Sequence, residues 1–361
     1  MNALIVFNEK DTDNLFVRTL HEAIRRQGID VERSTRAFWE SNIRYDIIHF
    51  QWPEEVVGWN CTDPSIIEKL KQRIDHFRAG GSRFVYTRHN IRPHYCSNPI
   101  IGQAYDIIET NSDLTVHMGQ FSLDEFRSRY PKSRNTLIPH HLYEHTYNEA
   151  ISRQEARRQL GIPADRYVIT SFGKFRDWEE IRMVLGAYTH LQTKKKYLLA
   201  PRMFPFSKHP GNSNPLKRLL SRIGYHLAMP LLNKTLRIKA GASEELISNE
   251  SLPLYIAAAD VIFVQRKQIL NSGNVPLAFL FHKVAIGPQT GNVGELLRET
   301  GNPAFDAARP ESIVRALEEA ASLAREGQGE RNHEYAIARF GTEHIGSMYA
   351  EAYRLLQNAD H

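Results

Sequence analysis

Short apolar runs alternate with amphipathic stretches over most of this 361-residue chain. Runs that are apolar nearly throughout, separated by helical patterns, indicate parallel strands buried on both faces of a sheet. We therefore predict an α/β fold. In the first part of the chain, the predicted strands are Ala3–Phe7, Ile47–Phe50, Phe84–Thr87, Leu114–His117 and Thr136–Ile138.

This alternation stops and then restarts near residue 150. The stretch Pro139–Ala150 is rich in His, Tyr and Asn, and Ser152–Glu155 follows it as a capping box for a helix that ends at Gly161. Two series of strands joined in this way predict two Rossmann-like domains with parallel sheets, facing across a cleft. The strands predicted for the second series are Tyr167–Phe172, Lys196–Ala200, Val261–Val264 and Val284–Ile286.

The length of the chain agrees with this division. A chain of 361 residues is too long for one ordinary domain and fits two of about 150 to 200 residues each. We place the N-terminal domain at 1–150 and the C-terminal domain at 151–335, with a basic insertion at 202–240. A single long helix is predicted at about Asn332–Gln357, so that 336–361 forms a helical C-terminal segment.

Composition narrows the class of protein. Hydrophobic residues make up 42% of the chain and charged residues 24%, which is typical of globular proteins. The net charge of +5 favours acidic ligands or an anionic membrane surface, but it is too small for a nucleic-acid-binding arm. Cys61 and Cys96 form neither a disulfide framework nor a zinc-binding pattern, which fits a reducing cytoplasm.

The amino-terminal sequence indicates a folded segment and not a targeting segment. The sequence MNALIVFNEKD turns charged directly after its apolar run, which predicts a buried first strand instead of a signal peptide. No apolar run approaches the ~18 residues that a membrane-spanning helix needs. We expect a cytoplasmic protein that is soluble, or at most peripheral at the inner face of the membrane.

The segment 202–240 differs from the rest because its cations are not balanced by acidic residues. Within it, Leu216–Leu232 alternates basic and apolar residues at helical spacing. One interpretation is a basic amphipathic helix resting on a membrane that carries a lipid-linked acceptor. The other is an ordinary surface helix with a solvated charged face. The cations are Arg202, Lys208, Lys217, Arg218, Arg222, Lys234, Arg237 and Lys239.

A first candidate site follows the strand that opens the second series. In Ser171–Arg176, Gly173 would let a phosphate approach the backbone, and Lys174 and Arg176 are spaced to face one pyrophosphate. The alternative is a strand-to-helix turn whose cations are merely solvated. We also assign Arg202 to the donor-binding residues.

A second candidate is the turn Ser272-Gly273-Asn274, which we expect to open a helix and present free backbone N–H groups to a diphosphate. The alternative is a plain helix start, since every helix needs a cap. Because both candidate loops follow strands of the same half, they are expected at the crevice where such sheets bind ligands.

A third candidate is the glycine turn Gly291–Gly294, which is expected to place Glu295 at a helix N-terminus. That carboxylate would accept hydrogen bonds from sugar hydroxyls or would simply complement the helix dipole.

The candidate residues in the first half of the chain are histidines. His89 follows a buried strand directly, and His140 ends the last strand of this half. A histidine at this edge of a sheet can hydrogen-bond a substrate, although lone histidines near strand ends are commonly structural. No spacing among the histidines matches a metal motif, so no metal is expected.

Taken in order, these fragments resemble the GT-B glycosyltransferases, and in particular the bacterial family 4-like transferases of exopolysaccharide, capsule and O-antigen synthesis. Many of those transferases carry T-x-H-N-x-x-P-H, I-P-H-x-x-Y, F-G-x-I-R-type, A-A-D-V and G-N-x-x-E-L segments. The matching segments here are Thr87–His94, Ile138–Tyr143, Phe172–Arg176, Ala258–Val261 and Gly291–Leu296.

The resemblance implies a role for each candidate residue. His89 would approach the transferred sugar, and His140 is the second catalytic candidate. Lys174 and Arg176 would grip the diphosphate, Ser272–Asn274 would cradle it, and Glu295 would contact the donor sugar or ribose. The resemblance also implies that the terminal helix crosses back onto the first domain.

Three departures from the family pattern bear on function. Family members usually have a lysine just after the phosphate loop, where this chain has Trp178–Glu180. They also carry two glutamates eight positions apart, where this chain has Leu277, which cannot accept a ribose hydrogen bond. The first loop, Asn8–Asn14, is acidic and lacks the usual glycine pair.

The resemblance implies a hexosyltransferase-type glycosyltransferase that moves a sugar from a UDP- or GDP-sugar to a glycan, with a lipid-linked acceptor in bacterial surface polysaccharide synthesis. No cofactor is expected beyond the nucleotide sugar as co-substrate. The alternative is a catalytically degenerate binding subunit of a glycosyltransferase complex. A nucleotide-sugar epimerase has no specific support. The base, the sugar, the acceptor and the anomeric outcome stay open.

Overall fold

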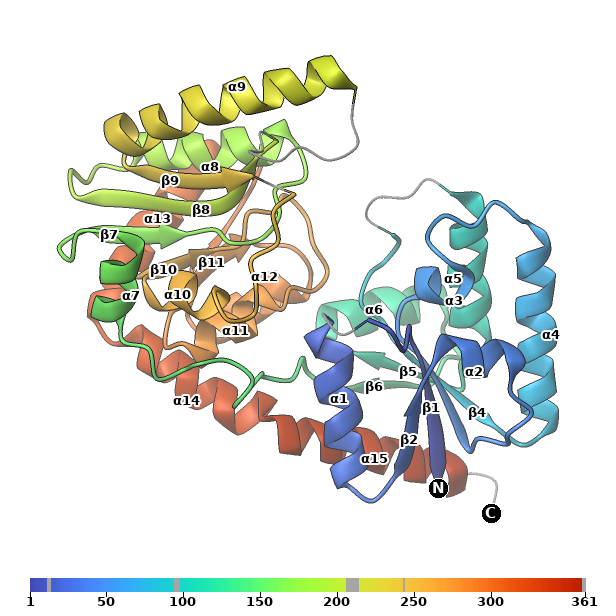
Figure 1. Cartoon of the computed structure of the whole chain (residues 1–361). Helices are drawn as coiled ribbons and strands as arrows, with labels where there is room; N and C mark the ends of the chain where they lie inside the picture. Colours follow the sequence, from blue (N-terminus) through green and yellow to red (C-terminus); the bar gives the residue numbers. More distant parts are fainter. Residues whose placement is uncertain (12–13, 94–97, 206–213, 243, 359–361) are drawn as a thin grey trace. The chain divides into compact units, whose positions relative to one another are not determined.

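The computed structural model describes residues 1–11, 14–93, 98–205, 214–242 and 244–358. Lys208 of the basic segment and His94 of the first-half motif lie outside these residues. The chain divides into two compact units (Figure 1). Unit 1 comprises Met1–Tyr143 and Arg339–His361, and unit 2 comprises Glu144–Ala338.

Unit 1 is built on a six-stranded sheet in the order β2-β1-β3-β4-β5-β6, and every neighbouring pair of strands is parallel. Its elements are β1 Asn2–Val6, α1 Leu15–Arg26, β2 Asp30–Arg33, α2 Thr35–Glu40, β3 Ile47–Phe50, α3 Pro53–Val57, α4 Ser65–Ala79, β4 Arg83–Thr87, α5 Pro99–Asn111, β5 Leu114–His117, α6 Gln120–Arg129, β6 Asn135–Leu137 and α15 Thr342–Asn358.

Unit 2 repeats this plan with a six-stranded parallel sheet in the order β12-β11-β10-β7-β8-β9. Its elements are α7 Arg153–Leu160, β7 Tyr167–Thr170, α8 Trp178–His190, β8 Lys196–Phe204, α9 Pro215–Leu231, a π-helical turn η1 Leu232–Leu236, β9 Ile238–Ala242, α10 Leu252–Ala257, β10 Val261–Phe263, α11 Asn274–Leu280, β11 Val284–Pro288, α12 Gly291–Glu299, β12 Ala304–Phe305, α13 Pro310–Arg325 and α14 Gln328–Phe340.

Successive side chains of a strand point to opposite faces of the sheet, and in unit 1 both faces are covered. In β1, Leu4 and Val6 enter one hydrophobic core, which contains residues of α2 to α5. Ala3 and Ile5 enter a second core on the opposite face, together with residues of α1 and α15. The continuous apolar runs of the sequence therefore predicted the α/β fold and its parallel sheets correctly.

Three strands were not predicted. β2 has the sequence DVER and only Val31 of it is buried, so it shows no apolar run. β9 lies within the basic segment, where the cations obscure its pattern, and β12 has only two residues. All three lie at or next to a sheet edge, where burial on both faces is not required.

The predicted terminal helix is in fact two helices. α14 ends at Phe340 and α15 begins at Thr342, so the single helix expected over Asn332–Gln357 is interrupted at Gly341. The prediction of the helix after the linker is confirmed: the Ser152 side chain accepts a hydrogen bond from the Glu155 amide, and Gly161 ends the helix in the left-handed conformation with φ of 67°.

The C-terminal helix α15 packs in the core of unit 1 beside α1. Gly346 faces Ala23 so closely that a Cβ atom at position 346 would lie 2.7 Å from the Ala23 carbonyl oxygen. Ile345, Tyr349 and Tyr353 flank this contact and are fully buried. The segment that closes the sequence is thus an integral layer of the first unit.

No helix among the described residues is both long enough and apolar enough to cross a membrane.

The close approach of the two helices predicts the effect of a small change. Gly346→Ala should lower the free energy of unfolding by about 1–3 kcal/mol, because the new methyl group would have to push α15 away from α1. Chemical denaturation followed by circular dichroism measures this. The matched control is Gly102→Ala in α5, where nothing lies within 4 Å of the added atom and stability should be equal or higher. Equal stability of Gly346→Ala and the wild type would contradict the packing described here.

Candidate functional site

The strand order of unit 2 creates a switch point between β7 and β10. From β7 the chain continues to β8 and β9 on one side, and it later returns to β10, β11 and β12 on the other side. The loops that follow β7 and β10 therefore leave the same edge of the sheet in opposite directions. Ligands of doubly wound sheets bind in the crevice at such a point. The predicted loop Ser171–Arg176 and the predicted turn Ser272–Asn274 belong to these two loops.

The two loops contact each other at Gly173. A Cβ atom at this position would lie 2.9 Å from Nε2 of Gln265 and 3.3 Å from Nδ2 of Asn274. Gln265 Nε2 donates a 2.6 Å hydrogen bond to the Gly173 carbonyl, and Ser171 Oγ donates a 2.8 Å bond to Gln265 Oε1. A side chain at this position would therefore have to displace the buried amide of Gln265.

Arg266 fixes the rest of the loop that follows β7, and sequence reasoning missed it. Its guanidinium donates to the Lys174 carbonyl at 2.9 Å and to the buried carboxylate of Glu180 at 2.7 Å. The same Glu180 carboxylate accepts a 2.8 Å hydrogen bond from the Arg176 amide. Burial raises the pKa of Glu180, and the charge of Arg266 opposes this effect. The available signal was its place directly after a predicted strand in the second series.

The predicted cations of this site have different surroundings. Lys174 forms an ion pair with Glu244 at 2.9 Å, and both side chains are exposed enough for an anionic ligand to displace the carboxylate. Arg176 is half-buried at the end of the same loop. Arg202 lies in β8, and its carbonyl accepts a 3.3 Å hydrogen bond from the Phe175 amide. The loop that follows β7 therefore carries Lys174 and Arg176, and the backbone of Arg202 lies beside it.

The turn before α11 differs from the prediction of free backbone amides. The Asn274 amide donates a 3.3 Å hydrogen bond to Ser272 Oγ, and the Val275 amide donates a 3.4 Å bond to the Ser272 carbonyl. Ser272 therefore satisfies these amides within the turn itself. Both bonds are long. Gly273 directly precedes the helix, whose first residue is Asn274.

The third predicted turn is part of a helix. α12 begins at Gly291, so Gly294 lies inside the helix, and Glu295 lies in its second turn and not at its N-terminus. Gly291 has a φ of 64°, and a Cβ atom there would lie 2.1 Å from the Ile269 carbonyl oxygen. Close backbone packing against the loop after β10 explains this glycine. Asn292 Nδ2 adds a 2.7 Å hydrogen bond to Asn271 Oδ1 in that loop.

Unit 1 has its own switch point between β1 and β3, where the strand order also reverses. Trp52 follows β3 and stacks on His89, which follows β4, with 3.7 Å between ring centroids and 14° between the planes. Phe16, at the start of α1, lies 4.9 Å from His89 and 4.9 Å from His140 between ring centroids. The two predicted histidines are therefore brought together around Phe16. Sequence reasoning missed Phe16 and Trp52.

A buried hydrogen-bond chain connects His89 to the C-terminal helix. His89 Nε2 lies 2.8 Å from Gln51 Oε1, and Gln51 Nε2 lies 3.0 Å from His49 Nε2. His49 Nδ1 in turn lies 2.6 Å from the Tyr353 hydroxyl of α15. Since an amide oxygen can only accept and an amide nitrogen can only donate, we infer that His89 carries its proton on Nε2 and His49 on Nδ1.

Burial keeps these histidines uncharged. It lowers the pKa of His89 well below the ordinary value, with the neighbouring His140, His49 and His141 adding to the effect. The pKa values of His49 and His140 are lowered to about 3 for the same main reason. Neutral imidazoles can accept or donate a hydrogen bond to a sugar hydroxyl, but they do not attract an anion.

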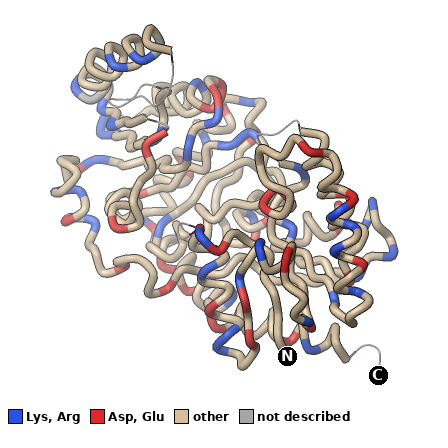
Figure 2. Tube along the Cα trace, turned by 45° about the vertical axis from the view of Figure 1, so that its right-hand side comes forward, with Lys and Arg blue, Asp and Glu red and all other residues tan. Residues whose placement is uncertain are grey.

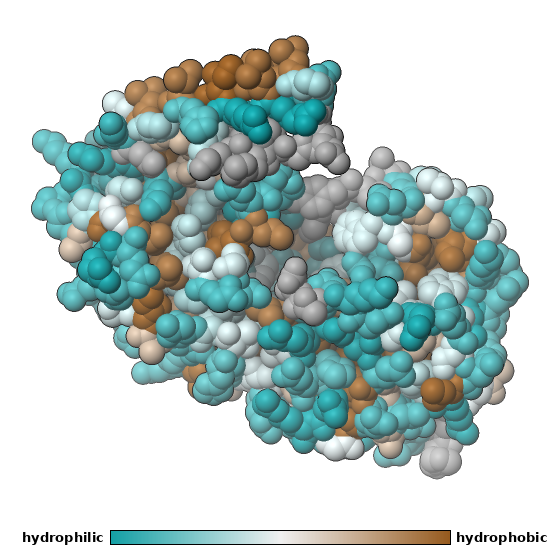
Figure 3. Space-filling model, viewed as in Figure 1, coloured by the Kyte–Doolittle hydropathy of each residue, from teal (hydrophilic) through white to brown (hydrophobic). Residues whose placement is uncertain are grey.

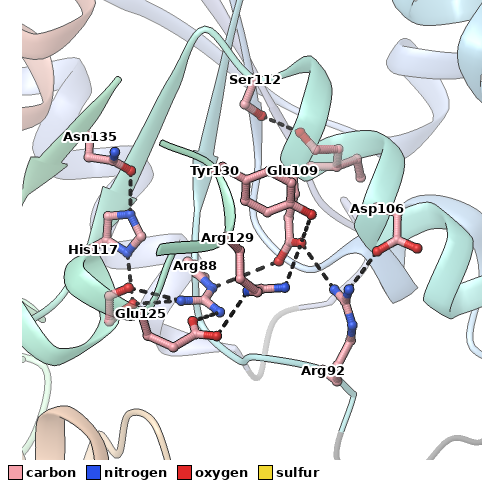
Figure 4. A network of polar contacts seen from close by, with 12 residues as sticks. Arg88, Arg92, Asp106, Glu109, Ser112, His117, Glu125, Arg129, Tyr130 and Asn135 are labelled. Carbon is pink, nitrogen blue, oxygen red and sulfur yellow. Dashed lines mark hydrogen bonds and ion pairs between the residues drawn. The ribbon is translucent and has the colours of Figure 1, made fainter. Parts of the chain in front are cut away.

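Arg88, which directly precedes His89, has no exposed surface and is committed to an ion-pair network (Figure 4). Its guanidinium lies 2.5 Å from Glu125 and 3.9 Å from Glu109. Arg129 pairs with both of these carboxylates, and Arg92 pairs with Glu109. The network anchors the end of β4 and so positions the loop that carries His89.

No group of His, Cys, Asp and Glu side chains that could hold a metal ion occurs in the part of the chain that the structure describes.

Solved structures with the same architecture cover nearly all of this chain. Sucrose-phosphate synthase from Thermosynechococcus elongatus is 16% identical, with a TM-score of 0.70 and 99% of each chain covered. HepE from Anabaena, in complex with UDP, is 14% identical, with a TM-score of 0.68 and coverage of 98% of this chain and 99% of that one. The catalytic domain of starch synthase IV from Arabidopsis thaliana is 11% identical, with a TM-score of 0.65 and 99% of each chain covered.

This chain has the GT-B fold. The fold predicted from the motif order is thereby confirmed. No family model and no curated protein sequence matches the chain, so the likeness lies in its architecture.

The contact between the two loops of unit 2 predicts a stability effect. Gly173→Ala should lower the free energy of unfolding by about 1 kcal/mol or more, because Gln265 would have to move and give up its hydrogen bonds. Gly186→Ala in α8, where nothing lies within 4 Å of the added atom, is the matched control. Urea denaturation of both variants provides the measurement, and equal stabilities would show that the loops do not pack in this way.

The buried His49 predicts a dependence of stability on pH. Its pKa is about 3 in the folded state, whereas the unfolded chain has the ordinary value of about 6.5. Below that value the unfolded state binds a proton that the folded state does not, so stability falls as the pH falls. The contribution should be about 2 kcal/mol between pH 7.5 and pH 5.

Urea unfolding at both pH values should therefore show a smaller pH dependence in His49→Asn than in the wild type. The exposed His344 of α15 provides the control variant, His344→Asn, which should keep the dependence of the wild type. An unaltered pH dependence in His49→Asn would refute the assignment.

Proposed function

We propose that this protein is a glycosyltransferase of the hexosyltransferase type that uses a nucleotide-diphosphate sugar, a UDP- or GDP-sugar, as donor. The observation that carries this proposal is the convergence of the Gly173–Arg176 loop and the Ser272–Asn274 turn at the switch point of unit 2. A loop with two cations beside a turn rich in polar groups at this place suits a diphosphate. HepE, which shares the fold, is solved with UDP and with UDP-glucose.

The proposed chemistry is mainly electrostatic. Lys174 and Arg176 neutralise the diphosphate as it leaves, and their positive charge takes the role that a metal ion has in other transferases. The clamp formed by Gln265 and Arg266 keeps the loop in place before the donor arrives, so that little free energy is lost in ordering it. Arg202 and Glu295 complete the proposed donor-binding set.

The acceptor is proposed to be a glycan in bacterial surface polysaccharide synthesis, linked to a lipid and presented at the inner face of the membrane. This part of the proposal rests on the resemblance of the motifs and on the basic segment 202–240. His89 and His140 are the proposed catalytic residues. Their neutral rings suit contact with sugar hydroxyls, and we assign them positioning of sugar instead of charge neutralisation.

A second candidate function, a degenerate binding subunit of a glycosyltransferase complex, has specific observations in its favour. Leu277 is buried in α11, where family members would place a carboxylate for ribose. Glu180 occupies the region of the usual lysine and is held by Arg266. Glu179 is paired with Lys267. A protein that binds UDP but neither transfers nor hydrolyses any sugar of a UDP-, GDP- and dTDP-sugar panel would favour this candidate.

The phosphate grip can be tested directly. Lys174→Ala combined with Arg176→Ala should weaken UDP binding about tenfold or more, because two charge-assisted contacts are lost. Isothermal titration calorimetry measures the affinity. Arg182→Ala combined with Lys194→Ala removes the same charge from exposed positions of unit 2 and should leave the affinity unchanged. Equal affinity of both double variants would remove the proposed grip.

A further inference from the structure

α9 presents a long row of large apolar side chains to solvent. They recur every three or four residues, which places them on one face of the helix. Their exposed fractions range from 46% to 70%. Figure 3 shows them as a continuous hydrophobic band along α9. We call this band the α9 face, and its members are Leu216, Leu219, Leu220, Ile223, Leu227 and Leu231.

The opposite side of the helix holds it on unit 2. Met229 is buried in the core of this unit, and Tyr225 packs against the same core with Leu232 of the following π-helical turn. These residues are also spaced by three or four positions, so they define a second face. α9 therefore has two apolar sides, and only one of them is needed for folding. Six large aliphatic side chains left on the other side form a patch that monomeric proteins rarely expose.

The charges around this face have a single sign. Between residues 202 and 240 the sequence has no Asp or Glu. Arg218 and Arg222 are exposed on α9, and Lys234 is exposed just beyond its end. Figure 2 shows Lys and Arg but no Asp or Glu along this helix. Arg218 and Arg222 lie seven positions before Tyr225 and Met229, so they are on the side of the helix away from the α9 face. An apolar helix face on a segment whose charges are all positive matches a surface that is apolar inside and anionic outside, as a bilayer with acidic phospholipids is.

A second copy of the chain fits this face poorly. Pairing two copies through the α9 face would bring together two segments whose charges are all positive. No carboxylate on the helix is available to compensate them, so like charges would oppose the pairing.

We infer that the α9 face docks unit 2 on an anionic phospholipid bilayer, with the helix lying in the plane of the membrane surface. At 17 residues, the helix is about 25 Å long and its apolar side chains would enter the boundary between headgroups and acyl chains. The inference deepens the proposed function, on which it rests for the presence of a lipid-linked acceptor, and it assigns the membrane contact to the donor-binding unit.

The test is flotation of the full-length protein with vesicles. The wild type should float with vesicles of phosphatidylcholine containing about a third phosphatidylglycerol at about 50 mM NaCl, and much less at about 500 mM. Leu220→Gln, Ile223→Gln and Leu227→Gln together should reduce the bound fraction about tenfold or more, since they remove apolar surface at the centre of the face. Glutamine keeps a high helix propensity, so α9 should remain folded.

Matched controls separate this face from general effects. Ile43→Gln, Leu246→Gln and Leu355→Gln together change three other exposed aliphatic residues and should float like the wild type. Arg218→Gln with Arg222→Gln should weaken binding to the anionic vesicles, whereas Arg315→Gln with Arg325→Gln on α13 should not.

Three results would overturn the inference. The first is a wild type that does not float at low salt. The second is equal flotation of the α9 triple variant and its control. The third is a wild type that binds no vesicles and sediments as a dimer, whereas the triple variant sediments as a monomer. UDP calorimetry on the same samples keeps the two proposals apart. Calorimetry with GDP is added for the same reason. A protein that floats but binds neither UDP nor GDP supports the α9 face and contradicts the proposed donor, and a protein that binds one of them but does not float contradicts only the α9 face.

Discussion

The candidate donor site depends on the hydrogen bonds that tie the loop after β7 to the loop after β10. Gln265 and Arg266 bind the carbonyl groups of Gly173 and Lys174, and Arg266 also holds the buried Glu180. The two cations of the loop repel each other, and an unattached loop would have many conformations. Ordering such a loop on ligand binding would therefore cost free energy. Here the neighbouring strand supplies that order in advance, because the switch point places both loops at one edge of the sheet.

In unit 1 the candidate residues are held in place in a different way. His89 and His140 are kept neutral by burial among aromatic rings, and the hydrogen-bond chain through Gln51 and His49 ends on Tyr353 of the last helix. The final segment of the sequence thus contacts His49, whose tautomer is set by the Gln51 amide. The buried charge of Arg88, which precedes His89, is paired with the carboxylates of Glu125 and Glu109. The candidate sites of the two units therefore differ: the one in unit 2 has cations, and the one in unit 1 has neutral hydrogen-bonding groups.

Most of the fold could be predicted from the sequence because a strand buried on both faces must be apolar nearly throughout. Strands such as β3 and β5 were predicted with the bounds that they have. β2 was missed because its exposed edge position removes that requirement. The candidate loops were located from glycines and cations after strands. Arg266 was not, since its role depends on contacts with residues 86 and 92 positions away.

The sequence by itself determined the parallel α/β architecture, the two units and the amphipathic nature of α9. The spacing of apolar residues and the length of the chain can both be read directly from the sequence. Only the tertiary structure decided which of two apolar sides of α9 is buried, and that Gly291 begins a helix and so moves Glu295 away from its N-terminus. It also decided that Gln265 packs against Gly173. These outcomes depend on the strand order, which sets the neighbours of each loop and leaves no periodic pattern in the sequence.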